Sequence, residues 1–353
     1  MRSQKPIQVL MPDLPEYFEE NEFFWRELNL SAKKINHEEN LPLPKNSLLY
    51  CNSLSHWKRR LIISEKSSLS VIIATNEYYK KDNWLDVNNY ESIKCAFLQY
   101  LPQNQRTKFG AILKFIFSSP HILREKAFWG ILKSSSKNYF EMRSLKFDVP
   151  VFSFPLGYTD RFAKELKKLE LLPENSQSLY SQEIYNNSSR DTRVSFEGQK
   201  GRWYRRLMVE YFEKNAAART NKYGSFGGFT DLPETTNYVE SILASRFVVC
   251  PPGNVSSQSF RYYESIALGA IPIVTEASIQ DWNTHNYWPQ NIKWKSANFV
   301  DIWRSLQKLD SKSIDDLSSK LRYYLAEQLK TTKKLLRTSV ENSNTLHGKD
   351  SNG

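Results

Sequence analysis

A short apolar segment that ends in a proline–glycine turn constrains the fold of this chain more than any other feature. The apolar run Phe247–Cys250 is followed by the turn Pro251 to Gly253 and then by the periodic stretch Ser257–Leu268. Gly269 and a second apolar run, Ile271–Thr275, come next. Glycine adopts a positive φ at little cost just after a helix. This order predicts a strand, a helix and a second, parallel strand.

The same turn predicts where a ligand binds. In parallel sheets covered by helices, ligands bind at the carboxyl edge of the strands. Ser257 and Ser259 are suited to cap the helix that starts there, and the free N–H groups and positive dipole end of such a helix attract a phosphate. We therefore assign Gly253, Ser257 and Ser259 to a phosphate-binding turn.

Two charged residues on the predicted helix extend this site. Arg261 lies in the first turns, where it can make a charge-assisted contact to a diphosphate. Glu264 follows three residues later on the same helical face, and its carboxylate suits the two hydroxyls of a ribose. An arginine and a glutamate at this spacing are often only a surface ion pair. The prediction therefore depends on their combination with the turn and the serine-rich cap.

The length of 353 residues indicates two domains. In the first half, short apolar segments alternate with segments of helical spacing, which predicts an α/β fold with a parallel sheet. The predicted strands are Ile7–Met11, Ser47–Cys51, Ser70–Ala74 and Val149–Phe154, and the predicted helices are Asn21–Lys34 and Lys108–Phe117. In the second half, Thr192–Phe196 is a predicted strand, with predicted helices at Arg202–Glu213 and near Thr236–Ala244.

The polar stretch 174–191 is the predicted linker between the domains. It separates an amino-terminal, acceptor-side domain of residues 1–173 from a nucleotide-binding domain of residues 192–312. Residues 313–337 are predicted to form a basic amphipathic helix, and residues 338–353 a disordered tail.

The segment 245–274 resembles the carboxyl-terminal motif of exostosin-type glycosyltransferases. The matching elements are the strand Ser245–Phe247, the turn Pro251 to Gly253, the pair Ser259 and Arg261, the carboxylate Glu264, and the segment Gly269 to Ile273. Upstream, Arg193 to Gly198 resembles the strand and glycine that open the same domain, so the resemblance covers about residues 190–285. Pro252 departs from the family, which usually has a basic or small residue there.

This resemblance implies an α/β fold of the GT-B type, in which two Rossmann-like domains with parallel sheets face each other across a cleft. It also implies an inverting, metal-independent transfer from a nucleotide-sugar, usually a UDP-sugar, to a glycan acceptor in polysaccharide or glycoconjugate synthesis. The chain has no Asp-x-Asp sequence, the metal site of GT-A enzymes, so no metal or other cofactor is expected. Two interpretations remain open: a fucosyltransferase-like GT-B enzyme that uses a GDP-sugar, and a non-catalytic nucleotide- or sugar-binding protein.

Further site residues are expected at the same sheet edge and in the first half. Gly198, Lys200 and Arg202 follow the first strand of the second domain and are added to the donor site. An inverting transfer needs a general base for the acceptor hydroxyl. Three candidates near predicted strand ends remain open for this role: Asp160, Glu77 and His56.

Charge indicates the kind of partner. Lys and Arg exceed Asp and Glu by 49 to 38, a net charge of +11, which suits an anionic nucleotide-sugar, a lipid-linked glycan or a membrane surface. The excess is spread along the chain without an RNA-binding signature, so no nucleic-acid partner is expected. The basic stretch Ile314–Leu336 has two interpretations. It lies on an anionic membrane, or it packs across the domains with its lysines in water.

Cysteine usage and a glycosylation sequon indicate a compartment. Cys51, Cys95 and Cys250 are few and far apart, which predicts neither disulfides nor a zinc site and fits a reducing cytosol. A glycan on the sequon Asn254-Val255-Ser256 would block the predicted turn. The first residues, broken by Pro12 and Pro15, predict neither a secretory signal nor an anchor. We expect a cytoplasmic protein, with peripheral association at the inner membrane left open.

Overall fold

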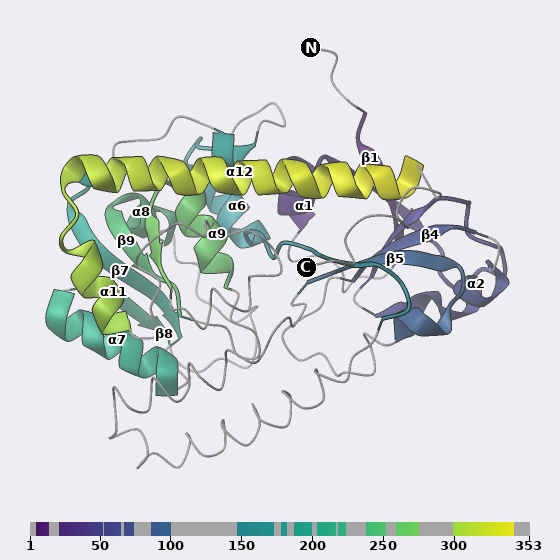
Figure 1. The fold of residues 1–353 in the computed structure, drawn as a ribbon, viewed down its shortest axis with the longest axis horizontal. Coiled ribbons are helices and arrows are strands. Elements are labelled where there is room, and N and C mark those ends of the chain that lie inside the picture. Colours follow the sequence, from purple (N-terminus) through teal and green to yellow (C-terminus); the bar gives the residue numbers. More distant parts are fainter. Residues whose placement is uncertain are drawn as a thin grey trace. The chain divides into compact units, whose positions relative to one another are not determined.

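Two compact units make up the part of the chain that the computed structural model describes. The described residues are 5–13, 21–51, 53–64, 67–73, 86–99, 147–172, 178–181, 187–199, 203–216, 218–223, 238–251, 259–274 and 299–341. The first unit holds those up to 99 together with 147–155 and 328–341, and the second holds those from 156 to 327. Each unit contains one parallel sheet with helices (Figure 1). The predicted α/β class is therefore confirmed.

The sheet of the first unit has the strand order β2-β1-β3-β4-β5-β6, and its paired strands are parallel. The strands are β1 (Ile7–Pro12), β2 (Leu30–Ile35), β3 (Leu48–Cys51), β4 (Leu69–Ile73), β5 (Ile93–Leu98) and β6 (Val151–Ser153). The chain places β2 on one side of β1 and β3 on the other. The winding direction thus reverses between β1 and β3, and such a topological switch point is where open α/β sheets bind ligands.

The core of the first unit consists of its central strands and an aromatic cluster. Every residue of β3 and β4 is buried, as expected for parallel strands covered on both faces. The ring of Phe24 lies 5.7 Å from that of Tyr50 and 5.0 Å from that of Phe154. The helical segments are α1 (Asn21–Glu27), η1 (Leu54–Trp57), α2 (Lys58–Ile63) and η2 (Asp86–Asn89).

The sheet of the second unit has the order β10-β9-β7-β8, again with parallel pairs. Its strands are β7 (Thr192–Gln199), β8 (Arg219–Tyr223), β9 (Ser245–Val249) and β10 (Ile271–Ile273). Its helical segments are α6 (Asp160–Lys168), η4 (Leu179–Ser181), η5 (Asn187–Ser189), α7 (Trp203–Ala216), α8 (Tyr238–Leu243), α9 (Phe260–Ala267) and α11 (Phe299–Leu306). The winding direction reverses between β7 and β9, which gives this sheet a switch point of its own.

A buried arginine fixes the ends of two helices in the second unit. Arg190 donates hydrogen bonds to the carbonyls of Ile242, Ser245 and Leu268. Burial lowers the pKa of Arg190 to about 10, so the side chain remains cationic at neutral pH. A cation at the carboxyl end of a helix is favourable. Gly269 follows α9 with a φ of 74°, as the sequence predicted for this position.

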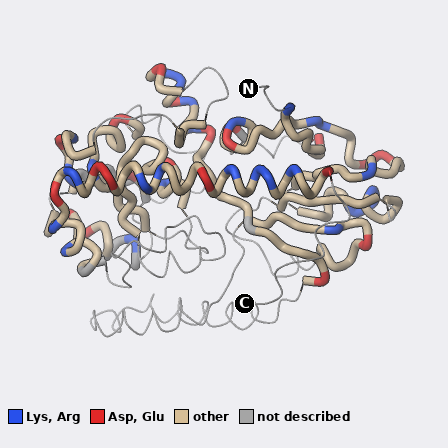
Figure 2. Tube along the Cα trace, turned by 45° about the horizontal axis from the view of Figure 1, so that its top comes forward, with Lys and Arg blue, Asp and Glu red and all other residues tan. Residues whose placement is uncertain are grey.

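The longest helix, α12 (Ser311–Glu341), contributes residues 311–327 to the second unit and 328–341 to the first. Its buried residues recur every three or four positions, as in a helix face that packs against protein. They include Ile314, Ser318, Leu321, Leu325, Leu329, Thr332, Leu336 and Ser339. Charged residues of both signs occupy other positions, shown in blue and red in Figure 2. One face of α12 is therefore packed against protein.

Some predicted elements differ from those observed. The segment Asn21–Lys34 was expected to be one helix, but it forms α1 and then strand β2. Asn29 turns the chain with a φ of 52°, and pairing with β1 extends residues 30–35 in place of the helix. Strand β5 and helices α2 and α6 were not predicted. The predicted helix Lys108–Phe117 lies outside the described residues.

The observed units also divide the chain at other positions than the predicted domains. The boundary falls between residues 155 and 156, before the expected linker at 174–191. Helix α12 continues to Glu341, beyond the predicted end at 337, because Ser339 is buried and its carbonyl accepts a hydrogen bond from Ser70. Within the described part of the chain, no helix combines the length and apolarity needed to cross a bilayer.

Candidate functional site

The candidate site lies at the switch point of the second sheet, where β7 and β9 end side by side. Ser195 of β7 pairs with Val248 of β9, so Gly198 and Cys250 are both close to the carboxyl edge. Helix α9 begins shortly after β9, with Ser259 at its N-cap position. The Ser259 side chain makes no capping hydrogen bond. The predicted capping position is therefore confirmed, but the predicted capping contact is absent.

Arg261 crosses from α9 to the end of β7. Its guanidinium carbon lies 5.0 Å from the ring centroid of Phe196, a cation–π contact. A Cβ atom on Gly198, two residues along the same strand face, would lie 2.5 Å from Nη2 of Arg261. Gly198 also has a φ of 141°, which other residues rarely adopt. Gly198 thus provides both the backbone conformation and the space that let the guanidinium rest on this strand end.

The guanidinium of Arg261 has no hydrogen-bonding partner among the described residues. Its Nε is buried and unsatisfied, and no carboxylate in the described ranges forms an ion pair with it. Guanidinium donors favour carboxylates and phosphates, often in two parallel bonds. A partly exposed arginine held by an aromatic ring, with its donors uncommitted, is therefore suited to bind an anionic ligand.

Glu264, one turn further along α9, is buried at 3% exposure. Its carboxylate accepts hydrogen bonds from the starts of two neighbouring helices. Its Oε1 accepts hydrogen bonds from the backbone N–H and the hydroxyl of Thr159, at 3.2 and 2.9 Å. Its Oε2 accepts a hydrogen bond from the hydroxyl of Tyr238. Burial and the Glu264 charge raise the pKa of Tyr238 well above its usual value. Glu264 therefore anchors the starts of α6 and α8, a structural role that the sequence did not indicate.

A second buried carboxylate lies in the same region. Glu165 on α6 is 8% exposed, accepts a hydrogen bond from the backbone N–H of Val239 and lies 3.5 Å from Nε of Arg161. Desolvation by burial raises its pKa, and the nearby charge of Glu264 raises it further. Cys250, at the end of β9, is also buried, and desolvation raises the pKa of its thiol to about 12. This burial favours the protonated thiol at neutral pH.

The structure brings together four of the predicted donor-site residues at one sheet edge and helix: Gly198, Ser259, Arg261 and Glu264. Other predicted donor residues and one candidate base lie outside the described residues: Gly253, Ser257, Lys200, Arg202 and Glu77. Asp160 is the first residue of α6, directly after Thr159, the partner of Glu264. His56 lies in η1 of the first unit.

Three residues of this site were not predicted from the sequence. Phe196 supports Arg261, and Thr159 and Tyr238 bind Glu264. Phe196 had a usable signal, because an aromatic residue two positions before a strand-end glycine lies on the same face. Thr159 and Tyr238 lie 105 and 26 residues from Glu264, and no local pattern links them to it.

Comparisons with known proteins add little to these observations. No protein-family model matches the chain, and no curated protein matches it. Among solved structures, UDP-GlcNAc 2-epimerase from Neisseria meningitidis bound to UDP-GlcNAc is similar over 95% of this chain and 99% of its own. The identity is 10% and the TM-score 0.32, a likeness too weak to carry an argument. The functional assignment therefore depends on the residues of the site.

Proposed function

We propose that this chain is an inverting, metal-independent glycosyltransferase that binds a nucleotide-sugar, preferably a UDP-sugar, at the switch point of the second sheet. The resemblance of residues 190–285 to exostosin-type glycosyltransferases supports the reaction class. The observation that carries the proposal is the position of Arg261. Its cationic group rests at the carboxyl edge on Phe196, with no carboxylate partner among the described residues.

In the proposed transfer, the bond from the sugar C1 to the donor diphosphate breaks, and the nucleoside diphosphate leaves with the electron pair. Arg261 and the amino-terminal end of α9 stabilise the negative charge that develops on the diphosphate. The acceptor hydroxyl attacks C1 from the opposite side and gives its proton to a base. Among the three candidate bases, Asp160 follows the Thr159 that contacts Glu264, so we favour it for this role.

The proposed ribose contact of Glu264 is compatible with its protein contacts. An ionised carboxylate accepts about four hydrogen bonds. Thr159 supplies two donors to Oε1 and Tyr238 supplies one to Oε2. One acceptor position at Oε2 remains for a ribose hydroxyl. The acceptor substrate in this proposal is an oligosaccharide or a lipid-linked glycan.

Nucleotide binding tests the donor half of the proposal. Thermal unfolding is measured with UDP, GDP, CMP and ADP. A nucleotide at about ten times its Kd adds about 1.4 kcal/mol of stability, a shift of a few degrees. We expect UDP to give the largest shift and Arg261→Ala to weaken UDP binding about tenfold or more. Arg193→Ala is the matched control, because Arg193 stacks on Trp303 in the same unit at 5.1 Å. Equal UDP affinity in both variants would contradict the assignment.

Turnover of the donor separates an enzyme from a binding protein. We expect purified protein to release UDP slowly from a UDP-sugar with water as the acceptor, and faster with a suitable glycan. Binding of UDP without any release from a panel of UDP-sugars favours the non-catalytic interpretation. Preferential stabilisation by GDP favours the fucosyltransferase-like interpretation.

A further inference from the structure

A second cluster of polar side chains lies at the carboxyl edge of the first sheet. His37 follows β2, and His56 lies in η1, after β3. Their ring centroids are 6.3 Å apart. Strands β2 and β3 flank β1 on its two sides, and neighbouring strands lie about 4.8 Å apart. The two imidazoles therefore approach each other across the end of β1, beside the switch point of this sheet.

An arginine joins the two segments that carry the imidazoles. Arg59 follows His56 by three residues on the continuous helical segment of η1 and α2, so the two share a helical face. Nη1 of Arg59 lies 3.4 Å from the carbonyl oxygen of Glu38, the residue after His37. This backbone carbonyl is its hydrogen-bonding partner, and no described carboxylate pairs with it. The same two segments thus meet through the imidazoles and through Arg59.

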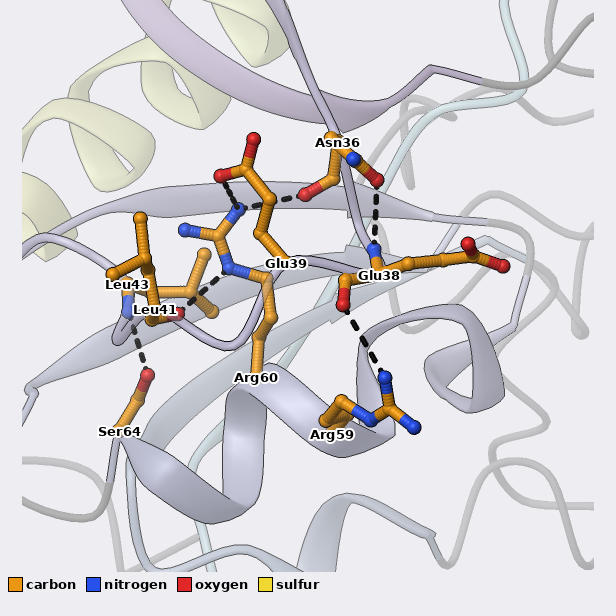
Figure 3. A network of polar contacts seen from close by, with 8 residues as sticks. All are labelled: Asn36, Glu38, Glu39, Leu41, Leu43, Arg59, Arg60 and Ser64. Carbon is orange, nitrogen blue, oxygen red and sulfur yellow. Dashed lines mark hydrogen bonds and ion pairs between the residues drawn. The ribbon is translucent and has the colours of Figure 1, made fainter.

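The loop that carries His37 is held firmly in place, as Figure 3 shows. Asn36 accepts a hydrogen bond from the backbone N–H of Glu38 at 3.0 Å. Arg60 donates to the carbonyls of Asn36 and Leu41, both at 2.9 Å. At the end of the loop, the N–H of Leu43 donates to Ser64 at 2.7 Å. These bonds tie the loop to α2 and fix His37 before any ligand binds.

Within this well-bonded loop, one polar atom is unsatisfied. Nδ1 of His37 is one of nine buried side-chain atoms that have no hydrogen-bonding partner among the described residues. The chain has five histidines, and the fold brings two of them together from different strand ends. Two imidazoles on firmly held segments at a sheet switch point are suited to bind a ligand.

The surrounding charges favour an anionic ligand. Glu39 is paired with Arg60 at 3.9 Å, and Asp13 with Lys34 at 3.6 Å. The side chain of Glu38 extends away from the guanidinium of Arg59, which faces the Glu38 carbonyl instead (Figure 3). Arg59 therefore keeps donors available beside the two imidazoles, and neutral or protonated imidazoles also donate N–H groups.

We propose that His37, His56 and Arg59 form a second binding site, which takes the phosphate or diphosphate ester of the acceptor. Arg59 supplies a charge-assisted hydrogen bond, and each imidazole supplies an N–H donor. The identity of the ligand as an acceptor rests on the proposed glycosyltransferase function. Phosphate binding at the three side chains does not depend on it.

Histidine NMR of the full chain tests this site. Imidazole signals of ¹⁵N-labelled protein are followed during titration with inorganic phosphate, glucose 1-phosphate and geranyl diphosphate, against sodium chloride at equal ionic strength. We expect two of the five imidazoles to shift in a saturable way, and His37→Asn and His56→Gln to identify them. Arg59→Gln is expected to weaken phosphate binding about tenfold, whereas Lys45→Gln, an exposed change in the same unit, leaves it unchanged.

Each outcome decides a separate question. Absence of saturable shifts, or equal shifts of all five imidazoles, overturns the site. Tighter binding of geranyl diphosphate than of glucose 1-phosphate assigns a lipid-linked acceptor, and the reverse order a soluble sugar phosphate. If two imidazoles respond to phosphate but UDP does not stabilise the protein, the proposed function is overturned and this site is not. Normal UDP binding without any imidazole response overturns this site alone.

Discussion

Replacement of Gly198 by alanine perturbs the donor site without removing any of its polar groups. The new Cβ would lie 2.5 Å from Nη2 and 3.5 Å from Cζ of Arg261. The guanidinium is the end of a flexible side chain, so it moves aside and leaves the ring of Phe196. That movement forfeits a cation–π contact of about 0.5–1 kcal/mol. The φ of 141° adds backbone strain, for a total destabilisation of about 2–3 kcal/mol.

The larger effect of Gly198→Ala is expected on nucleotide affinity. A charge-assisted hydrogen bond contributes about 1.5–3 kcal/mol, so displacement of Arg261 is expected to weaken UDP binding about 10- to 100-fold. Calorimetric titration with UDP measures the affinity, and urea denaturation measures the stability. Gly269→Ala is the matched control. Gly269 also has a positive φ, of 74°, but lies about 12 Å along α9 from Arg261.

The two glycine variants distinguish the effect of backbone strain from the effect of moving the Arg261 guanidinium. We expect Gly269→Ala to lose stability and keep its UDP affinity. We expect Gly198→Ala combined with Arg261→Ala to bind UDP no worse than Arg261→Ala alone, because the glycine acts through the arginine. Suppose that Arg261→Ala binds UDP poorly but Gly198→Ala keeps the wild-type UDP affinity. That result would refute the reasoning that Gly198 positions the guanidinium.

Further predictions concern the interior of the second unit. Arg190→Ala leaves the carbonyls of Ile242, Ser245 and Leu268 unpaired, so we expect a loss of roughly 3–5 kcal/mol or failure to fold, measured by urea denaturation. Thr159→Val removes the hydroxyl that caps α6 and binds Glu264, and is expected to cost about 1–2 kcal/mol in the same assay. The raised pKa of Glu165 means that the folded state binds more protons than the unfolded state between the two pKa values. Stability from this group is therefore present at low pH and lost as pH rises. Glu165→Gln should gain stability relative to wild type as pH rises above the usual glutamate pKa of about 4.3; a constant difference would contradict this.

The sequence predicts those elements that are determined by neighbouring residues, and it fails for those determined by contacts between distant segments. The two strands and the helix between Ser245 and Ile273 were predicted closely, because apolar runs, prolines and Gly269 mark their limits within a few residues. Strand β2 was taken for a helix because its residues LSAKKI follow α1 without a periodic break. Its extended conformation comes from pairing with β1, a contact between separate segments.

The site shows the same limit. Arg261 and Glu264 were found from their spacing on one helix, but their actual surroundings differ. Arg261 has no hydrogen-bonding partner among the described residues, whereas Glu264 is bound by Thr159 and Tyr238 from two other helix starts. Spacing on a helix predicts which residues share a face. It does not predict which of them the rest of the chain will already have paired.

The topology of the two sheets bears on what a transferase needs. A group transfer requires one place for the donor and another for the acceptor. Each unit repeats the same winding, with one strand order reversal, at β1 and β3 in the first and at β7 and β9 in the second. Each reversal carries an arginine without a described carboxylate partner, Arg59 in one and Arg261 in the other. In the proposed reaction, one switch point would bind the phosphate of the donor and the other the phosphate of the acceptor.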